Sequence, residues 1–120
     1  MTINIAIIPA RLGSKRIKNK NIKKFYNKPI IQWTFEILKK SKVFSHIIVS
    51  TESHKIINIC KKIGIEDFVI RPLKLSGDFI GIQKVIEHSI IELEKPPIIR
   101  RIMIVIRYVI ICFLFLYNSL

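Results

Sequence analysis

Short apolar runs alternate along this chain with segments of helical length that are apolar on one side only. The runs lie at 3–8, 46–50 and 67–70, and the amphipathic segments lie at about 30–40, 54–63 and 81–92. Runs this short and this apolar are typical of strands that are buried on both faces of a sheet. Strands that alternate with helices favour right-handed βαβ units. The sequence therefore predicts an α/β fold with a parallel sheet and flanking helices.

The ends and the buried faces of these helices follow from single residues and from spacing. Ser53 is expected to cap the second helix at its start, and Gly64 is expected to end it in a left-handed conformation. Cys60 falls within the apolar pattern of the same helix, so we expect it in the core. The residues expected to face the core in the first and third helices are Ile30, Ile31, Phe35, Ile37, Leu38, Val85, Ile86, Ile90 and Ile91.

The chain is strongly basic, with a formal net charge of +13 in 14.0 kDa. Residues 11–28 hold a dense group of lysines and arginines without one acidic residue. Such a segment suits polyanionic partners: nucleotide phosphates, nucleic acid or an anionic membrane. Nucleic acid is the weaker alternative, because aromatic platforms for bases are not interleaved with these cations. The segment leaves the first predicted strand at its carboxyl end, where parallel sheets bind ligands, and we therefore interpret it as a binding loop.

The residue types of this loop are those that phosphate binding requires. Gly13 has no side chain, which lets backbone N–H groups approach a phosphate closely. The cations and further donors are, in chain order, Arg11, Ser14, Lys15, Lys20 and Asn21. Their spacing matches neither the Walker loop nor the dinucleotide-binding glycine motif. The loop therefore predicts a phosphate site of another kind.

Residues 5–21, with the sequence IAIIPARLGSKRIKNKN, resemble the signature of the CMP-sialic acid synthetase (acylneuraminate cytidylyltransferase) family. Further similar elements follow in order: KPII at 28–31, IIVSTE at 47–52, and RPLKLSGD at 71–78. The resemblance covers about residues 3–95 and is closest to the pseudaminic or legionaminic acid branch. It implies the Rossmann-like α/β fold of sugar-nucleotide transferases.

The resemblance also implies a reaction and its residues. CMP would pass from CTP to a nonulosonic, sialic-acid-like sugar with release of pyrophosphate, in a cytoplasmic homodimer that serves surface glycan synthesis. Lys15 and Lys20 are expected to act in catalysis, and Arg11, Lys15, Lys20 and Arg71 to converge on one cleft. The residues expected to bind the nucleotide are Arg11, Gly13, Ser14, Lys15, Lys20, Asn21, Arg71 and Asp78. Mg²⁺ is the expected cofactor, held by carboxylates that this chain does not contain, so no metal ligand is assigned.

One departure from the family pattern concerns base recognition. After Asp78 the family carries a Ser or Thr that helps to read the cytosine, whereas this chain has Ile80 and Ile82. The loss of one such hydrogen bond costs on the order of 1–3 kcal/mol. We therefore expect binding that depends on the phosphates and selects weakly for cytosine.

The segment 98–120 differs in character from residues 1–97, which we expect to form the nucleotide-binding part. It contains no acid, glycine or proline, and its apolar stretch 108–117 is too short to span a bilayer. A strand is expected at 108–112. The composition also resembles an out-of-frame translation of AT-rich DNA. We expect the 120-residue chain on its own to have no synthetase activity, because the metal carboxylates and the sugar pocket of the family are expected beyond it, and to be poorly soluble. Two alternatives stay open: an inactive remnant that retains anion binding, and a basic protein that binds nucleic acid or a membrane.

Overall fold

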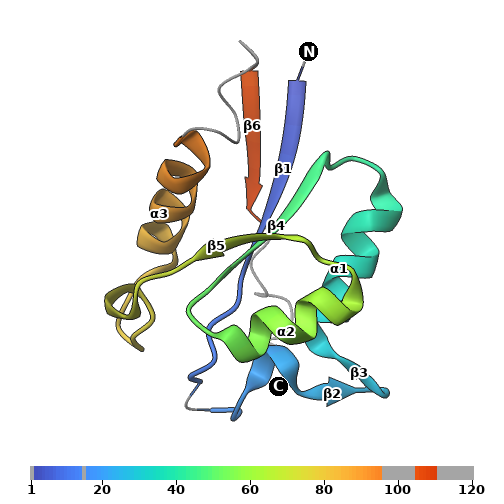
Figure 1. Cartoon of the computed structure of the whole chain (residues 1–120), viewed down its shortest axis with the longest axis vertical. Coiled ribbons are helices and arrows are strands. Elements are labelled where there is room, and N and C mark those ends of the chain that lie inside the picture. Colours follow the sequence, from blue (N-terminus) through green and yellow to red (C-terminus); the bar gives the residue numbers. More distant parts are fainter. Residues whose placement is uncertain (1, 15, 96–104, 111–120) are drawn as a thin grey trace.

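The computed structural model describes residues 2–14, 16–95 and 105–110, and it contains a four-stranded parallel sheet (Figure 1). The strands are β1 (Thr2–Pro9), β4 (His46–Thr51), β5 (Asp67–Ile70) and β6 (Val105–Ile110). The helices are α1 (Ile30–Ser41), α2 (His54–Ile63) and α3 (Ile82–Glu94). The predicted parallel α/β fold is therefore confirmed.

The strand order β5-β4-β1-β6 places β1 where the chain reverses its direction of winding. Helices α1 and α2 connect β1 to β4 and then β4 to β5, while α3 carries the chain back to β6 on the other side of β1. Neighbouring strands whose connections leave in opposite directions open a crevice beyond their carboxyl ends, and α/β sheets bind ligands there. The end of β1 is thus at the position where a site is expected.

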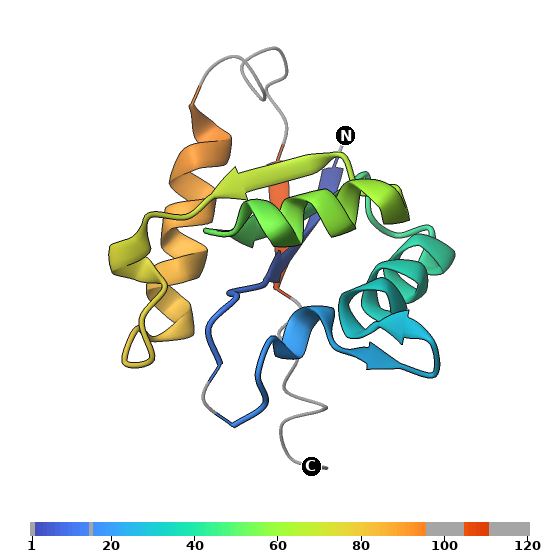
Figure 2. The same cartoon turned by 60° about the horizontal axis from the view of Figure 1, so that its bottom comes forward.

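Helices cover both faces of the sheet (Figure 2). The side chains of β1 alternate between two cores. Ala6 and Ile8 pack with α1 and α2, whereas Ile5 and Ile7 pack with α3. Cys60 is buried in the first of these cores, as predicted. Burial raises the pKa of its thiol to about 11, so the thiol stays protonated at neutral pH and acts as a small apolar side chain.

Helix α2 begins and ends as predicted. The Ser53 hydroxyl accepts the N–H of Ile56 at 3.4 Å, which is the expected N-cap bond. Gly64 has a φ of 106°, and its N–H donates to the Cys60 carbonyl at 3.1 Å. Residues with a side chain rarely adopt this φ, which explains why a glycine ends the helix.

Two isoleucines that the spacing placed in the core are exposed instead. Ile37 of α1 is 66% exposed, and Ile91 of α3 is 55% exposed. The buried side of α1 includes Phe35 and Leu38, and Ile37 follows Phe35 by two positions, which turns it about 200° around the axis. The buried residues of α3 are Val85, Ser89 and Leu93. The prediction was wrong because the sheet covers only a narrow stripe of each helix.

A short hairpin precedes α1, and the sequence analysis did not predict it. Its strands are β2 (Lys24–Phe25) and β3 (Lys28–Pro29). The turn residues Tyr26 and Asn27 have φ values of 46° and 65°, in the left-handed region that Asn tolerates better than most residues. The indole N–H of Trp33 donates to the Phe25 carbonyl at 2.8 Å and ties the hairpin to α1.

Strand β6 lies within the segment 98–120 and pairs in parallel with β1. The strand expected at 108–112 is confirmed as far as Ile110, but it begins earlier, at Val105, and residues 111 and 112 lie outside the described residues. The division of the chain at residue 97 stays a prediction. In the part of the chain that the structure describes, no helix has both the length and the apolarity to cross a membrane.

Candidate nucleotide-binding site

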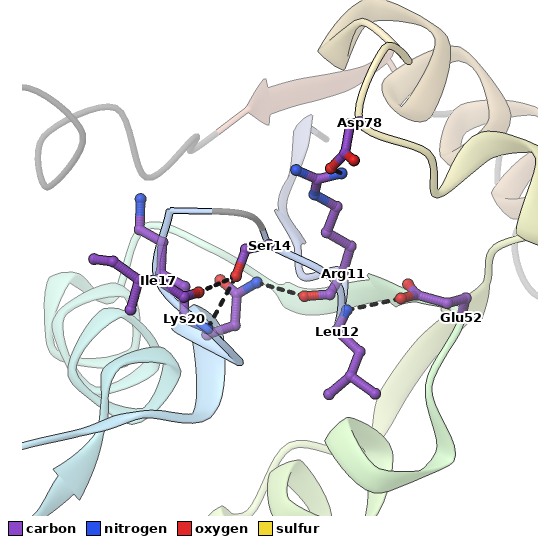
Figure 3. Close-up of polar contacts among 8 residues, drawn as sticks. Arg11, Leu12, Ser14, Ile17, Lys20, Glu52 and Asp78 are labelled. Atoms are coloured by element: carbon purple, nitrogen blue, oxygen red, sulfur yellow. Dashed lines mark hydrogen bonds and ion pairs between the residues drawn. The ribbon is translucent and has the colours of Figure 1, made fainter.

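The basic loop leaves β1 at the carboxyl edge of the sheet and is anchored at once to the end of β4 (Figure 3). The N–H of Ala10 donates to the Ser50 carbonyl at 2.8 Å. The N–H of Leu12 donates to Oε1 of the Glu52 carboxylate at 2.7 Å. These bonds extend the contact between the two strand ends past the last paired residue of β1, Pro9. The first residues of the loop are therefore held against β4.

Two polar side chains of the loop bond to its own backbone. The Ser14 hydroxyl donates to the Ile17 carbonyl and accepts the N–H of Lys20 at 3.3 Å. The amide of Asn21 donates to the Arg11 carbonyl at 2.9 Å. The sequence predicts Ser14 and Asn21 as direct donors to a nucleotide, and that role stays a prediction. In the structure their bonds close the loop upon itself.

Gly13 lies exposed in this loop and does not have a positive φ. A Cβ added at this position would meet no atom of the described chain within 4 Å. The fold of the chain therefore does not require a glycine here. The open space beside the backbone is the space that the predicted close approach of a phosphate needs.

Arg11 reaches from the loop to the segment that precedes α3. Its Nη1 lies 2.8 Å from Oδ1 of Asp78, and the two side chains are 30% and 32% exposed. Figure 3 shows the Arg11 side chain extended toward Asp78, while its carbonyl faces the other half of the loop. An ion pair this exposed adds little to stability. Its consequence is geometric, because it joins two segments that the sequence assigns to one nucleotide site.

Arg71 follows the end of β5, and its side chain is buried, with 4% of the residue exposed. Its Nη2 donates to the Ser50 carbonyl at 3.0 Å, the same oxygen that accepts the Ala10 N–H. Burial lowers the pKa of the guanidinium, the carboxylate of Glu52 raises it, and the positive charge of Arg11 lowers it. The structure thus brings Arg11 and Arg71 to the same edge, close enough for each charge to act on the other.

Of the two lysines predicted for catalysis, only Lys20 is among the described residues. Lys20 is partly buried and opens a 3₁₀ turn, Lys20–Ile22, that follows Asn19 at a φ of 54°. Lys15 lies outside the described residues. Arg11 and Arg71 therefore lie at the same edge of the sheet, while the convergence of both arginines with Lys15 and Lys20 on one cleft stays a prediction.

Glu52 belongs to this edge, although the sequence analysis did not include it among the site residues. Its Oε1 accepts the Leu12 N–H, and its Oε2 is buried without a hydrogen-bond partner in the described structure. Buried carboxylate oxygens without a partner are uncommon. The signal in the sequence is positional: an acid stands directly after a buried strand, at the edge where the basic loop begins.

The fit of these residues to a metal ion can be tested from their contacts. Among the described residues, no three His, Cys, Asp or Glu side chains come together as ligands. At the loop, the Glu52 carboxylate accepts a hydrogen bond from the Leu12 N–H, and the Asp78 carboxylate accepts one from the Arg11 guanidinium. These carboxylates do not form a Mg²⁺ site, and the predicted role of Mg²⁺ continues to rest on the family resemblance.

A parallel α/β sheet with a cationic loop at its winding reversal is a domain of the kind that binds ligands beyond the carboxyl ends of its strands. A family profile described as cytidylyltransferase matches residues 5–102, which include the second half of β1, the basic loop and the helices α1, α2 and α3. The chain belongs to the cytidylyltransferase family. The resemblance seen in the loop is thereby confirmed.

Curated relatives with similar sequences are named as cytidylyltransferases of pseudaminic acid or N-acylneuraminate. The bifunctional pseudaminic acid cytidylyltransferase of Helicobacter pylori is 39% identical over 90 residues, covering 75% of this chain and 17% of that protein. The pseudaminic acid cytidylyltransferase of Campylobacter jejuni is 37% identical over 87 residues, covering 72% of this chain and 38% of that protein. The N-acylneuraminate cytidylyltransferase of Escherichia coli is 38% identical over 86 residues, covering 72% of this chain and 20% of that protein. The chain thus spans less than half the length of these relatives.

A solved structure with the same fold is that of CMP:2-keto-3-deoxy-manno-octonic acid synthetase complexed with CTP. It matches with a TM-score of 0.71 and 17% sequence identity, over 92% of this chain and 39% of that one. Identity this low supports the fold and nothing finer. The Rossmann-like architecture predicted from the sequence is confirmed.

Proposed function

We propose that this chain forms the nucleotide-binding part of an enzyme that transfers CMP from CTP to a nonulosonic acid, with pseudaminic acid as the favoured sugar. The observation that carries the proposal is the basic loop at the carboxyl end of β1, with Arg11 and the buried Arg71 at the same edge. The names of the relatives support the choice of CTP and of the sugar class.

The proposed reaction is nucleotidyl transfer. A sugar hydroxyl oxygen attacks the α-phosphorus of CTP, the bond from that phosphorus to the bridging oxygen breaks, and pyrophosphate leaves with the bond's electrons. The hydroxyl proton passes to solvent. Lys15 and Lys20 are proposed to offset the charge on the phosphates, while Arg11 and Arg71 orient the nucleotide.

The internal bonding of the loop supports this role. Ser14 and Asn21 hold the loop in one shape through its own backbone, and the Leu12 amide is fixed on β4. Donors that are already oriented lose less conformational entropy when a ligand binds. A preformed loop is therefore suited to hold a triphosphate.

Calorimetric titration with CTP, UTP, ATP and inorganic tripolyphosphate tests the binding half of the proposal. We expect the three nucleotides to bind within about tenfold of one another, because Ile80 and Ile82 offer no side-chain hydrogen bond to the base. Lys20→Ala is expected to weaken all four ligands, and Lys62→Ala, an exposed lysine in the last turn of α2, serves as its control. Triphosphate binding that is absent, or equal in both variants, would contradict the proposal.

The transfer half is tested by product formation. The enzyme of which this chain is the nucleotide-binding part is incubated with CTP, Mg²⁺ and pseudaminic, legionaminic or N-acetylneuraminic acid, and CMP-sugar is measured by chromatography. The proposal expects a CMP-sugar with at least one of these acids, highest with pseudaminic acid. Triphosphate binding by the chain, combined with transfer only to sugars of another class, would retain the nucleotide site and reject the proposed acceptor.

Gly13→Ala is expected to weaken CTP binding while leaving the free energy of unfolding almost unchanged. The added methyl meets no atom of the described chain, so the free energy of unfolding should change by less than about 0.5 kcal/mol. The same methyl fills the space beside the backbone where a phosphate is proposed to lie, so the Kd for CTP should rise about tenfold. Urea unfolding and calorimetry measure the two effects. Unchanged CTP affinity would show that the phosphates do not approach Gly13.

A further inference from the structure

We propose that Glu52 is a positioning residue of the nucleotide site: its carboxylate holds the start of the phosphate loop in place from the end of β4. The inference rests on the function proposed above and adds a residue that neither the loop motif nor the family's cationic positions identified. Glu52 does not touch the nucleotide in this proposal. It acts through the backbone of the loop.

The contact that carries the inference is the bond from the Leu12 N–H to Glu52 Oε1, at 2.7 Å and partly buried. Leu12 stands between Arg11 and Gly13, so this bond sets the direction of the backbone at the residues proposed to meet the phosphates. The next anchor toward β1 is the Ala10 N–H on the Ser50 carbonyl at 2.8 Å. Glu52 therefore holds the loop to β4 at Leu12, where the backbone bends, one residue before Gly13.

The surroundings of Glu52 also hold its carboxylate in place. Its second oxygen, Oε2, is buried, and the charge of the buried Arg71 acts on the carboxylate from the end of β5. Arg71 is itself bonded to the Ser50 carbonyl at 3.0 Å. The ends of β1, β4 and β5 are thus linked through Ser50 and Glu52. We therefore expect a substitution of Glu52 to affect the positions of both Arg11 and Arg71.

Simple electrostatics and positioning make opposite predictions for this residue. Glu52 is an acid beside a proposed triphosphate site, and an acid there repels the ligand. If charge alone mattered, every neutral variant would bind CTP more tightly. If the hydrogen bond to Leu12 matters, the outcome depends on whether the variant keeps an acceptor.

The test compares Glu52→Gln with Glu52→Ala. Both variants remove the same charge, but only glutamine retains an oxygen that can accept the Leu12 N–H. We expect Glu52→Gln to bind CTP and inorganic tripolyphosphate at least as tightly as the unaltered protein, and Glu52→Ala to bind both about tenfold more weakly. Unfolding midpoints of both variants are measured alongside, because a role in stability alone would lower the midpoint and leave the affinity of the folded protein unchanged. Equal affinities of the two variants would overturn the inference.

A second measurement does not depend on the folding of any variant. Amide hydrogen exchange of the unaltered protein should show the Leu12 N–H protected, because it is bonded to the Glu52 carboxylate inside the structure. Rapid exchange of the Leu12 amide in the unaltered protein also overturns the inference. Failure of the proposed function is distinguishable, since it would appear as no CTP binding by the unaltered protein while the Leu12 amide stays protected.

Discussion

Replacing Arg71 by alanine is expected to raise the Kd for CTP by about 10- to 100-fold, because hydrogen bonds to a charged group contribute about 1.5–3 kcal/mol. Arg71 is buried, with 4% of the residue exposed, and its guanidinium is fixed by a bond to the Ser50 carbonyl, so it is already oriented before a ligand arrives. The Ser50 carbonyl keeps its bond from Ala10 in the variant and is not left unpaired. Calorimetry with CTP measures the effect.

Two further variants make this result specific. Arg71→Lys keeps the positive charge but not the planar fork of donors, and we expect it to recover only part of the affinity. Lys62→Ala removes one positive charge at the far end of α2 and should change the Kd for CTP little. If Arg71→Ala and Lys62→Ala weaken CTP binding equally, net charge rather than Arg71 holds the nucleotide.

Ile31→Ala is expected to lower the free energy of unfolding by about 2–5 kcal/mol, as large-to-small changes in a packed core do. Ile31 is fully buried between α1 and the sheet, where it packs in the core that contains Ile8, Val49 and Ile56. Small domains have a free energy of unfolding of only about 5–15 kcal/mol, so this single change would remove a large share of the stability of a domain of this size.

Ile37→Ala on the same helix is the matched control. Ile37 is 66% exposed, so its truncation should change the free energy of unfolding by less than about 0.5 kcal/mol. Urea unfolding followed by circular dichroism measures both variants. Similar losses for Ile31→Ala and Ile37→Ala would mean that Ile37 is covered in solution and that α1 faces the sheet differently from the structure described here.

The sequence by itself determined the features that depend on neighbours along the chain. Alternating apolar runs and amphipathic segments predicted the parallel α/β sheet, because strand and helix periodicity are local properties. The caps of α2 were equally local: Ser53 bonds a residue three positions away, and Gly64 adopts a φ that favours glycine. The family was identified from the basic loop together with the elements at 28–31, 47–52 and 71–78 that follow it in order, since each of these is one continuous segment.

Only the tertiary structure decided which distant residues meet at the site. The bond between Leu12 and Glu52 and the pair of Arg11 with Asp78 exist because the strand order β5-β4-β1-β6 brings the ends of separate strands to one edge. No pattern within a single segment encodes that order, so Glu52 was left out of the predicted site. The exposure of Ile37 has the same cause: helical spacing shows that a helix has an apolar side, but the width of the stripe that is buried is set by what packs against it.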